Sequence, residues 1–189
     1  MRTLPLLLAA LLTGASAFAQ TPPQAPSQPQ PQGETLLVAP PAGYKVVTQK
    51  TAGNMTITEF IPKNEELPAW TEMVTIQVFA KLDNATPKQF QELMGAAWKR
   101  QCKTSQSFPV SDGVERGYAT SVWFQGCEHK GTPSKDELTW FKAIKGADAF
   151  YLVQKAFAYQ PTPEQMAPWI EYLRAVRVCD NRNPERACK

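Results

Sequence analysis

The sequence has little of the material from which enzyme active sites are usually built. Its 189 residues include one histidine, His129, and no Gly-x-Ser-x-Gly elbow, His-Glu-x-x-His motif or glycine-rich phosphate loop. No serine lies beside His129, so we expect this residue to be solvated at a strand end between Glu128 and Lys130. A zinc site needs three or four ligands. The nearness of Cys127 and His129 therefore predicts no metal, and we expect no cofactor.

Long apolar runs are absent after the first residues of the chain. Met1-Arg2 supplies a positive end, Leu4 to Leu12 is apolar, and Ala17-Phe18-Ala19 has the pattern that a signal peptidase cleaves. The apolar run is shorter than the roughly 20 residues of a membrane-spanning helix. Residues 1 to 19 are therefore predicted to be a signal peptide, which makes the protein periplasmic or secreted, with no membrane span.

The chain also lacks a large excess of positive or negative charge. The chain has 20 Lys and Arg against 17 Asp and Glu, and cleavage after residue 19 removes Arg2, which leaves 19 − 17, or +2. So small a charge, scattered along the chain, does not predict binding to nucleic acid or to an anionic membrane.

The composition divides the remaining chain into three parts. Residues 20 to 35 are rich in Pro and Gln and have almost nothing to bury, so we expect a disordered linker. The alternative is a ligand for a proline-recognising domain. Residues 36 to 178 are long enough for one domain with its own core. Residues 179 to 189 are expected to form a tail closed by a disulfide.

All four cysteines lie beyond residue 100, and an even number in an exported chain predicts disulfides. Three pairings are possible. We favour Cys102–Cys127, which joins a helix end to a strand end, and Cys179–Cys188, which closes a tail loop. Each bridge is worth about 3 kcal/mol by loop-closure entropy.

Residues 70 to 80 form the longest expected strand, rich in β-branched and aromatic side chains. Val74, Ile76 and Val78 give one apolar face, whereas the face with Thr75 and Phe79 could meet water, a second layer or a ligand. Residues 103 to 117, which include Pro and Gly, are expected to be a loop. The other expected strands are a short one at 36–38 and longer ones at 44–51, 55–61, 118–127, 137–145 and 149–159.

Two helices are predicted by a repeated Thr-Pro-x-Gln opening, which supplies an N-cap, a proline at the first helical position and a capping box. The openings begin at Thr86 and Thr162, and Pro168 is expected to bend the second helix or to mark its true start. The apolar stripes are Phe90, Leu93, Met94, Ala97 and Trp98 in the first helix, and Met166, Trp169, Ile170, Leu173 and Val176 in the second. A core face is favoured for the first stripe over a partner-binding face.

These elements predict an α+β fold in which an antiparallel sheet of about six strands packs with two amphipathic helices. Pro41-Ala42-Gly43-Tyr44 before a strand, Phe150-Tyr151-Leu152-Val153 after a turn, and the closing helix resemble the PsbP-like fold. DcrB-type and LpqN-type bacterial envelope proteins are similar. The resemblance implies non-enzymatic binding or assembly roles, and the four cysteines are no part of its pattern.

Five tryptophans favour a binding module, because Trp offers a large contact area at low entropic cost. Trp98 and Trp169 fall on core stripes, and the exposure of Trp123 and Trp140 depends on strand register. Trp70, at the junction of the Pro68 loop and the long strand, is the best candidate for a partner surface. Glu65, Glu66 and Glu72 would form a polar rim that suits a cationic partner.

We therefore expect a monomeric, exported, non-enzymatic module that recognises an envelope protein or a cell-wall component. The alternative is a periplasmic hydrolase whose site is assembled only in space.

Overall fold

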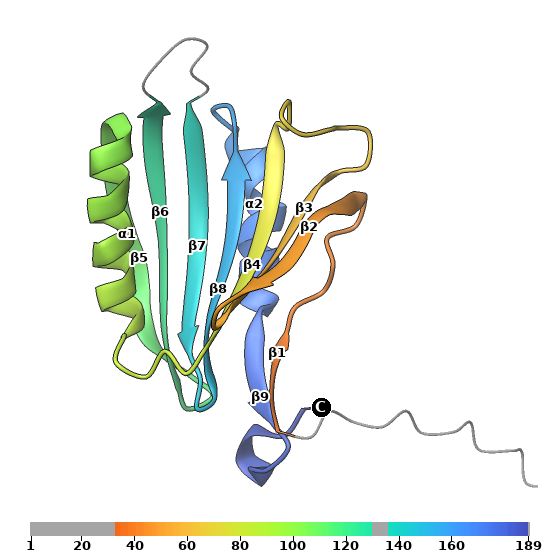
Figure 1. Cartoon of the computed structure of the whole chain (residues 1–189), viewed down its shortest axis with the longest axis vertical. Helices are drawn as coiled ribbons and strands as arrows, with labels where there is room; N and C mark the ends of the chain where they lie inside the picture. Colours follow the sequence, from red (N-terminus) through yellow and green to blue (C-terminus); the bar gives the residue numbers. More distant parts are fainter. Residues whose placement is uncertain (1–32, 130–135, 189) are drawn as a thin grey trace, which may run out of the picture. The chain divides into compact units, whose positions relative to one another are not determined.

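The computed structural model describes residues 33–129 and 136–188, which belong to one compact unit. The predicted signal peptide, most of the predicted linker and residues 130–135 lie outside the described residues. No described helix is long and apolar enough to cross a membrane. The elements, labelled in Figure 1, are β1 (Glu34–Leu37), β2 (Tyr44–Ala52), β3 (Met55–Pro62), β4 (Glu72–Ala80), α1 (Pro87–Gln101), β5 (Cys102–Glu115), β6 (Tyr118–His129), β7 (Glu137–Lys145), β8 (Ala149–Phe157), α2 (Pro163–Ala175), β9 (Arg177–Asp180) and a 3-10 helix (Pro184–Arg186).

The main sheet has seven antiparallel strands in the order β2-β3-β4-β8-β7-β6-β5. The predicted α+β class, with an antiparallel sheet and two helices, is therefore confirmed. β4, which corresponds to the predicted long strand, lies between β3 and β8, and it begins at Glu72, two residues later than predicted.

The prediction of a loop between α1 and β6 is wrong, because β5 occupies most of that segment. β5 is the edge strand, and its register with β6 shifts between Pro109 and Ser111. A proline has no N–H to donate, so within a sheet it is confined to edges and bulges, and Pro109 occupies both. The sequence signals of a loop were therefore signals of an irregular edge strand.

The short leading strand forms, but it does not join the main sheet. β1 pairs with β9, which the sequence did not predict, so Cys179 lies in a strand that begins at Arg177. The Glu34 carboxylate of β1 accepts hydrogen bonds from the backbone N–H of Ala147 at 2.6 Å and from the Tyr151 hydroxyl at 3.0 Å. This carboxylate holds the small sheet to the turn between β7 and β8.

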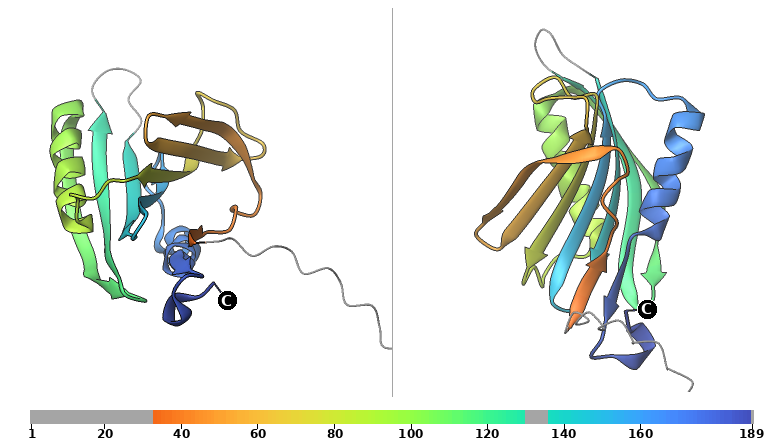
Figure 2. Two further views of the ribbon diagram at one scale, coloured as in Figure 1. Left: turned by 60° about the horizontal axis from the view of Figure 1, so that its bottom comes forward. Right: turned by 90° about the vertical axis from the view of Figure 1, so that its right-hand side faces the viewer.

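The two helices cover opposite faces of the main sheet, as the two views of Figure 2 show. The face with Ile76 and Val78 of β4 packs with Leu173 of α2, whereas Phe79 on the other face packs with Phe90 of α1. The semi-polar face of β4 therefore meets a second layer. The α1-side core also contains Trp123, Phe141, Ala143, Phe150 and Leu152.

Both helices begin as predicted. Thr86 and Thr162 each close a capping box, α2 starts at Pro163, and Pro168 lies inside the helix. Of the two alternatives for Pro168, a start of α2 at this residue is therefore wrong. The first stripe is a core face except at Leu93, which is 66% exposed because it turns away from the sheet.

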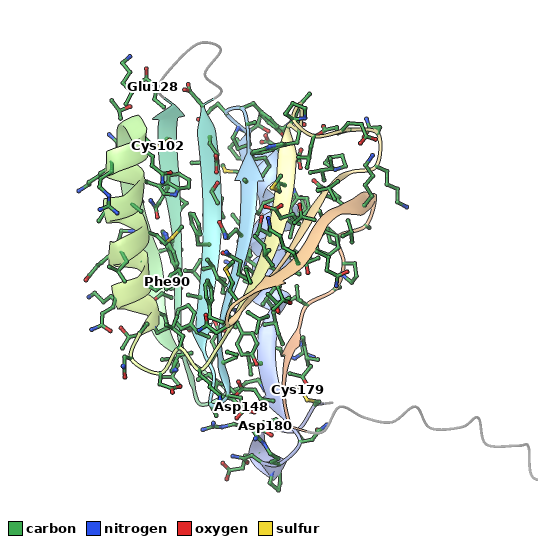
Figure 3. All side chains as sticks on the ribbon, viewed as in Figure 1. Phe90, Cys102, Glu128, Asp148, Cys179 and Asp180 are labelled. Carbon is green, nitrogen blue, oxygen red and sulfur yellow. A yellow bond between two sulfur atoms is a disulfide. The ribbon has the colours of Figure 1, made fainter. Side chains whose placement is uncertain are left out.

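The two disulfides pair Cys102 with Cys127 and Cys179 with Cys188, the same pairs that the sequence predicted. The first joins the start of β5 to β6. The second joins β9 to the segment after the 3-10 helix. Figure 3 places Cys102 and Glu128 near one end of the main sheet, and Cys179, Asp148 and Asp180 near the other.

Candidate functional site

The partner surface predicted around Trp70 stays a prediction, and its glutamates make contacts of their own. Glu65 accepts a hydrogen bond from the backbone N–H of Thr71 at 2.7 Å, and Glu66 forms an ion pair with Lys45. Trp70 is half-buried, just before β4. Through these contacts, the glutamates of the loop before β4 hold that loop in place.

Glu72 belongs to a buried network. The sequence predicted a place for it in a polar rim around Trp70, and this placement is corrected. Its carboxylate accepts hydrogen bonds from the Lys155 ammonium, from the Tyr44 hydroxyl and, at 2.8 Å, from the Tyr159 hydroxyl. The Lys155 Nζ also donates to the Tyr44 hydroxyl at 2.9 Å. The side chain of Lys155 is 0% exposed, and that of Glu72 is 23% exposed. β2, β4, β8 and the segment after β8 therefore meet at one carboxylate.

Aromatic rings surround the same ammonium. The Lys155 Nζ lies 3.8 Å from the ring centroid of Trp169, 4.6 Å from that of Phe157 and 5.0 Å from that of Tyr44. Tyr44 and Trp169 meet edge to face at 5.3 Å. A cation over an aromatic face is attracted by the ring quadrupole, most strongly by Trp. Lys155 thus links α2, through Trp169, to the sheet.

Burial and charge shift the pKa values of Lys155 and Glu72 in opposite directions. Burial lowers the pKa of Lys155 to about 8, although the hydrogen bond and charge of Glu72 offset part of that effect. Burial alone would raise the pKa of Glu72, but the hydrogen bonds from Lys155, Tyr44 and Tyr159 outweigh it and lower the pKa. Burial and the hydrogen bond to Glu72 raise the pKa of Tyr159 to about 12. Lys155 and Glu72 therefore form an ion pair at neutral pH, and the Lys155 ammonium is buried away from solvent. We interpret it as structural.

Sequence reasoning missed Lys155, although a signal was present. The residue lies in a strand whose neighbours are almost all apolar, at an alternating position with Val153 and Phe157 that faces the core. A lysine is almost never fully buried unless it is paired. That pattern predicts a buried partner, but it does not identify Glu72.

The more open feature is a row of aromatic side chains across β5, β6 and β7, on the face that α2 covers only in part. Phe108 is directly paired with Phe124, and Phe124 with Trp140. The rings stack with centroids 4.8 Å and 5.0 Å apart, and Phe108 is 43% exposed. In register the next residue is Lys155 of β8, so the row leads from the sheet edge to the buried network.

Phe108 and Phe124 of this row line a cleft of about 500 Å³, here called the aromatic cleft. Three of its lining residues are carboxylates, and none is Lys or Arg. Lys103 donates to Glu128 at 2.6 Å and lowers the pKa of that carboxyl. Cys127 also lines the cleft, so the disulfide to Cys102 ties its wall to the end of α1. The lining residues are Thr104, Ser105, Gln106, Phe108, Phe124, Gly126, Cys127, Glu128, Asp136, Glu137, Leu138, Tyr159 and Gln160.

The described residues bring together few groups suited to catalysis. The side chain of His129 lies outside them, so the hydrolase alternative stays a prediction. The Ser121 hydroxyl donates a hydrogen bond to the Asp112 carboxylate at 2.6 Å. No group of three metal-ligating His, Cys, Asp or Glu side chains occurs in the described part of the chain.

Comparisons with known proteins find only distant structural similarities. A comparison with protein families finds no match, and neither does one with curated protein sequences, so nothing supports the DcrB-type or LpqN-type assignment. Among solved structures, the Ran-binding protein Mog1p of Saccharomyces cerevisiae is similar at 9% identity and a TM-score of 0.42, over 77% of this chain and 89% of that one. A mutant of the protein Mog1 is similar at 11% identity and a TM-score of 0.44, over 72% of this chain and 78% of that one.

Proposed function

We propose that this protein is an exported, non-enzymatic binding module that recognises a basic peptide segment of an envelope protein through the aromatic cleft. The observation that carries the proposal is the cleft itself, an open hollow with an aromatic wall and a carboxylate lining. The predicted signal peptide and the two disulfides support export, since disulfides persist in oxidising compartments. The resemblance to PsbP-like envelope proteins agrees with a binding role.

Charge and exposure define the class of partner. Glu128, Asp136 and Glu137 line the cleft, and Lys103 forms an ion pair with Glu128. A lining with three carboxylates and no Lys or Arg is complementary to Lys or Arg side chains of a partner. Exposed aromatic rings such as Phe108 provide the apolar contact that dominates binding energy at interfaces, whereas charges at the rim mainly set the rate of association.

The test is site-specific photo-crosslinking in the periplasm from position 108, followed by mass spectrometry of the crosslinked peptide. We expect a Lys- or Arg-rich segment of one envelope protein. Binding of that protein should weaken at least about tenfold in Phe108→Ser and in Asp136→Lys, and the loss should grow at low salt for the second variant.

Trp70→Ala is the matched variant for the loop surface first expected from the sequence. If Trp70→Ala retains binding and Phe108→Ser loses it, the aromatic cleft is the binding site. If Trp70→Ala loses binding and Phe108→Ser retains it, the loop before β4 is the binding site. A crosslinked segment without basic residues would contradict the stated partner class. Turnover of peptidoglycan or ester substrates that disappears in His129→Ala would overturn the non-enzymatic reading.

A further inference from the structure

A second pocket, of about 280 Å³, lies between α2 and the strands β5, β6 and β7. It shares no lining residue with the aromatic cleft, and the proposed function does not use it. Four of its residues are aliphatic and three are charged. The lining residues are Val110, Ser111, Glu115, Val122, Trp140, Lys142, Ile170, Leu173 and Arg174.

The unusual member of this pocket is Lys142, whose side chain is 1% exposed. Its Nζ donates to Glu115 at 2.7 Å, and this is its one hydrogen bond within the part of the chain that the structure describes. An ammonium has three donors. A buried ammonium also requires a counter-charge, because an uncompensated buried charge costs several kcal/mol. Lys142 therefore depends on Glu115 while two of its donors remain unused.

The two partners differ in their freedom to move. The Glu115 side chain is 45% exposed and stands at the end of β5, immediately before the turn to β6. It can turn into water at little cost, since a hydrated carboxylate is stable there. Lys142 points from β7 into the space under α2 and has no comparable route to solvent. A different carboxylate that enters the pocket can take the place of Glu115.

The rest of the lining favours an anion with an apolar body. The pocket is lined by Lys142, Arg174 and one carboxylate, and Arg174 also pairs with Glu171 on α2. The indole Nε1–H of Trp140 is buried with no acceptor among the described side chains and backbone. Val122 and Leu173 supply apolar walls, and Val110, 50% exposed, stands at the opening. The donors suit the two oxygens of a carboxylate, and the walls suit a short hydrocarbon chain.

We propose that this pocket binds a monocarboxylate with a short apolar tail, whose carboxylate replaces that of Glu115 on Lys142. Pockets for small molecules usually measure about 300 to 1,000 Å³, so this one, at about 280 Å³, is just below that range and limits the ligand to a short chain. The same chemistry is offered by a free aliphatic acid and by the C-terminus of a peptide that ends in an apolar residue.

The experiment is calorimetric titration of the mature chain with octanoate, with 1-octanol and octanamide as neutral controls of similar size. Octanoate should bind saturably and quench tryptophan fluorescence, and the two controls should not bind. The free-acid and amide forms of a short peptide ending in Val-Leu separate the two sources of the carboxylate. Binding of the peptide acid but not of octanoate identifies a chain terminus as the ligand.

Three variants make the mechanism falsifiable. Glu115→Gln should bind octanoate about tenfold more tightly, because the ligand no longer competes with an internal carboxylate. Lys142→Met should lose binding. Lys145→Met is the matched control, since Lys145 lies on the same strand but faces α1 and donates to the Leu82 carbonyl at 2.6 Å. It should bind as the wild type does.

Several outcomes would overturn the proposal. Equal binding of octanoate and 1-octanol would show that the carboxylate is not recognised. Equal affinity in wild type and Glu115→Gln would show that Glu115 is not displaced. If a variant proves unstable, thermal melting of the wild type with and without octanoate decides the question, because a ligand of the folded state alone must raise Tm. An unchanged Tm at millimolar octanoate and at millimolar peptide acid would refute the site.

Discussion

The buried ion pair of Lys155 and Glu72 makes the stability of this protein depend on pH in an unusual direction. The ordinary pKa of a lysine, near 10.5, falls to about 8 for Lys155 on folding. The unfolded chain therefore holds more protons than the folded one between about pH 8 and pH 10.5, and stability rises with pH across that window. Below pH 8 both states are protonated, and this contribution is constant.

The magnitude follows from the two pKa values. At about 1.36 kcal/mol for each pKa unit, the protonated lysine opposes folding by about 3 kcal/mol at pH 7. Raising the pH to 9 removes about 1.4 kcal/mol of that opposition. Tyrosines whose pKa is raised by burial, such as Tyr159, act in the other sense, but an unfolded tyrosine titrates near pH 10, so each removes less than about 0.1 kcal/mol by pH 9.

The assay is urea unfolding of wild type and Lys155→Met at pH 7, 8 and 9, followed by circular dichroism. We expect the free energy of unfolding of the wild type to rise by about 1.4 kcal/mol relative to the variant between pH 7 and pH 9. Methionine cannot titrate and has a similar volume, so the variant provides the baseline. Parallel profiles for the two proteins would refute the assignment of a lowered pKa to Lys155.

Three further changes test the packing. Trp98→Ala should lower the free energy of unfolding by about 3 kcal/mol, since Trp98 packs edge to face on Phe141 in the α1-side core; a near wild-type urea midpoint would contradict this. Non-reducing peptide mapping should recover the Cys102–Cys127 disulfide. Removal of this disulfide should lower the free energy of unfolding by about 3.5 kcal/mol, and removal of Cys179–Cys188, which closes a shorter loop, by about 2.6 kcal/mol. Gly146→Ala should cost about 1–3 kcal/mol, because its Cβ would lie 2.1 Å from a Glu34 carboxylate oxygen; an unchanged Tm would show that β1 moves aside.

Features that depend on neighbouring residues were readable from the sequence. A Thr-Pro-x-Gln segment caps a helix through contacts three residues apart, so Thr86 and Thr162 could be assigned without any knowledge of the fold. Alternation along β4 likewise identified its apolar face. The even cysteine count and the placement of the pairs at element ends led to the same two disulfides that the structure contains.

The candidate sites depended on tertiary structure. Glu72, Lys155 and Tyr44 meet although 28 to 111 residues separate them, and Lys142 pairs with Glu115 across 27 residues. Which strands become neighbours is decided by the burial of whole faces, and a one-residue shift of register would send each side chain to the opposite face. Local pattern could therefore determine the helices and most of the strands, whereas only the long-range pairing of strands decided which charges are buried and where the sheet leaves open pockets.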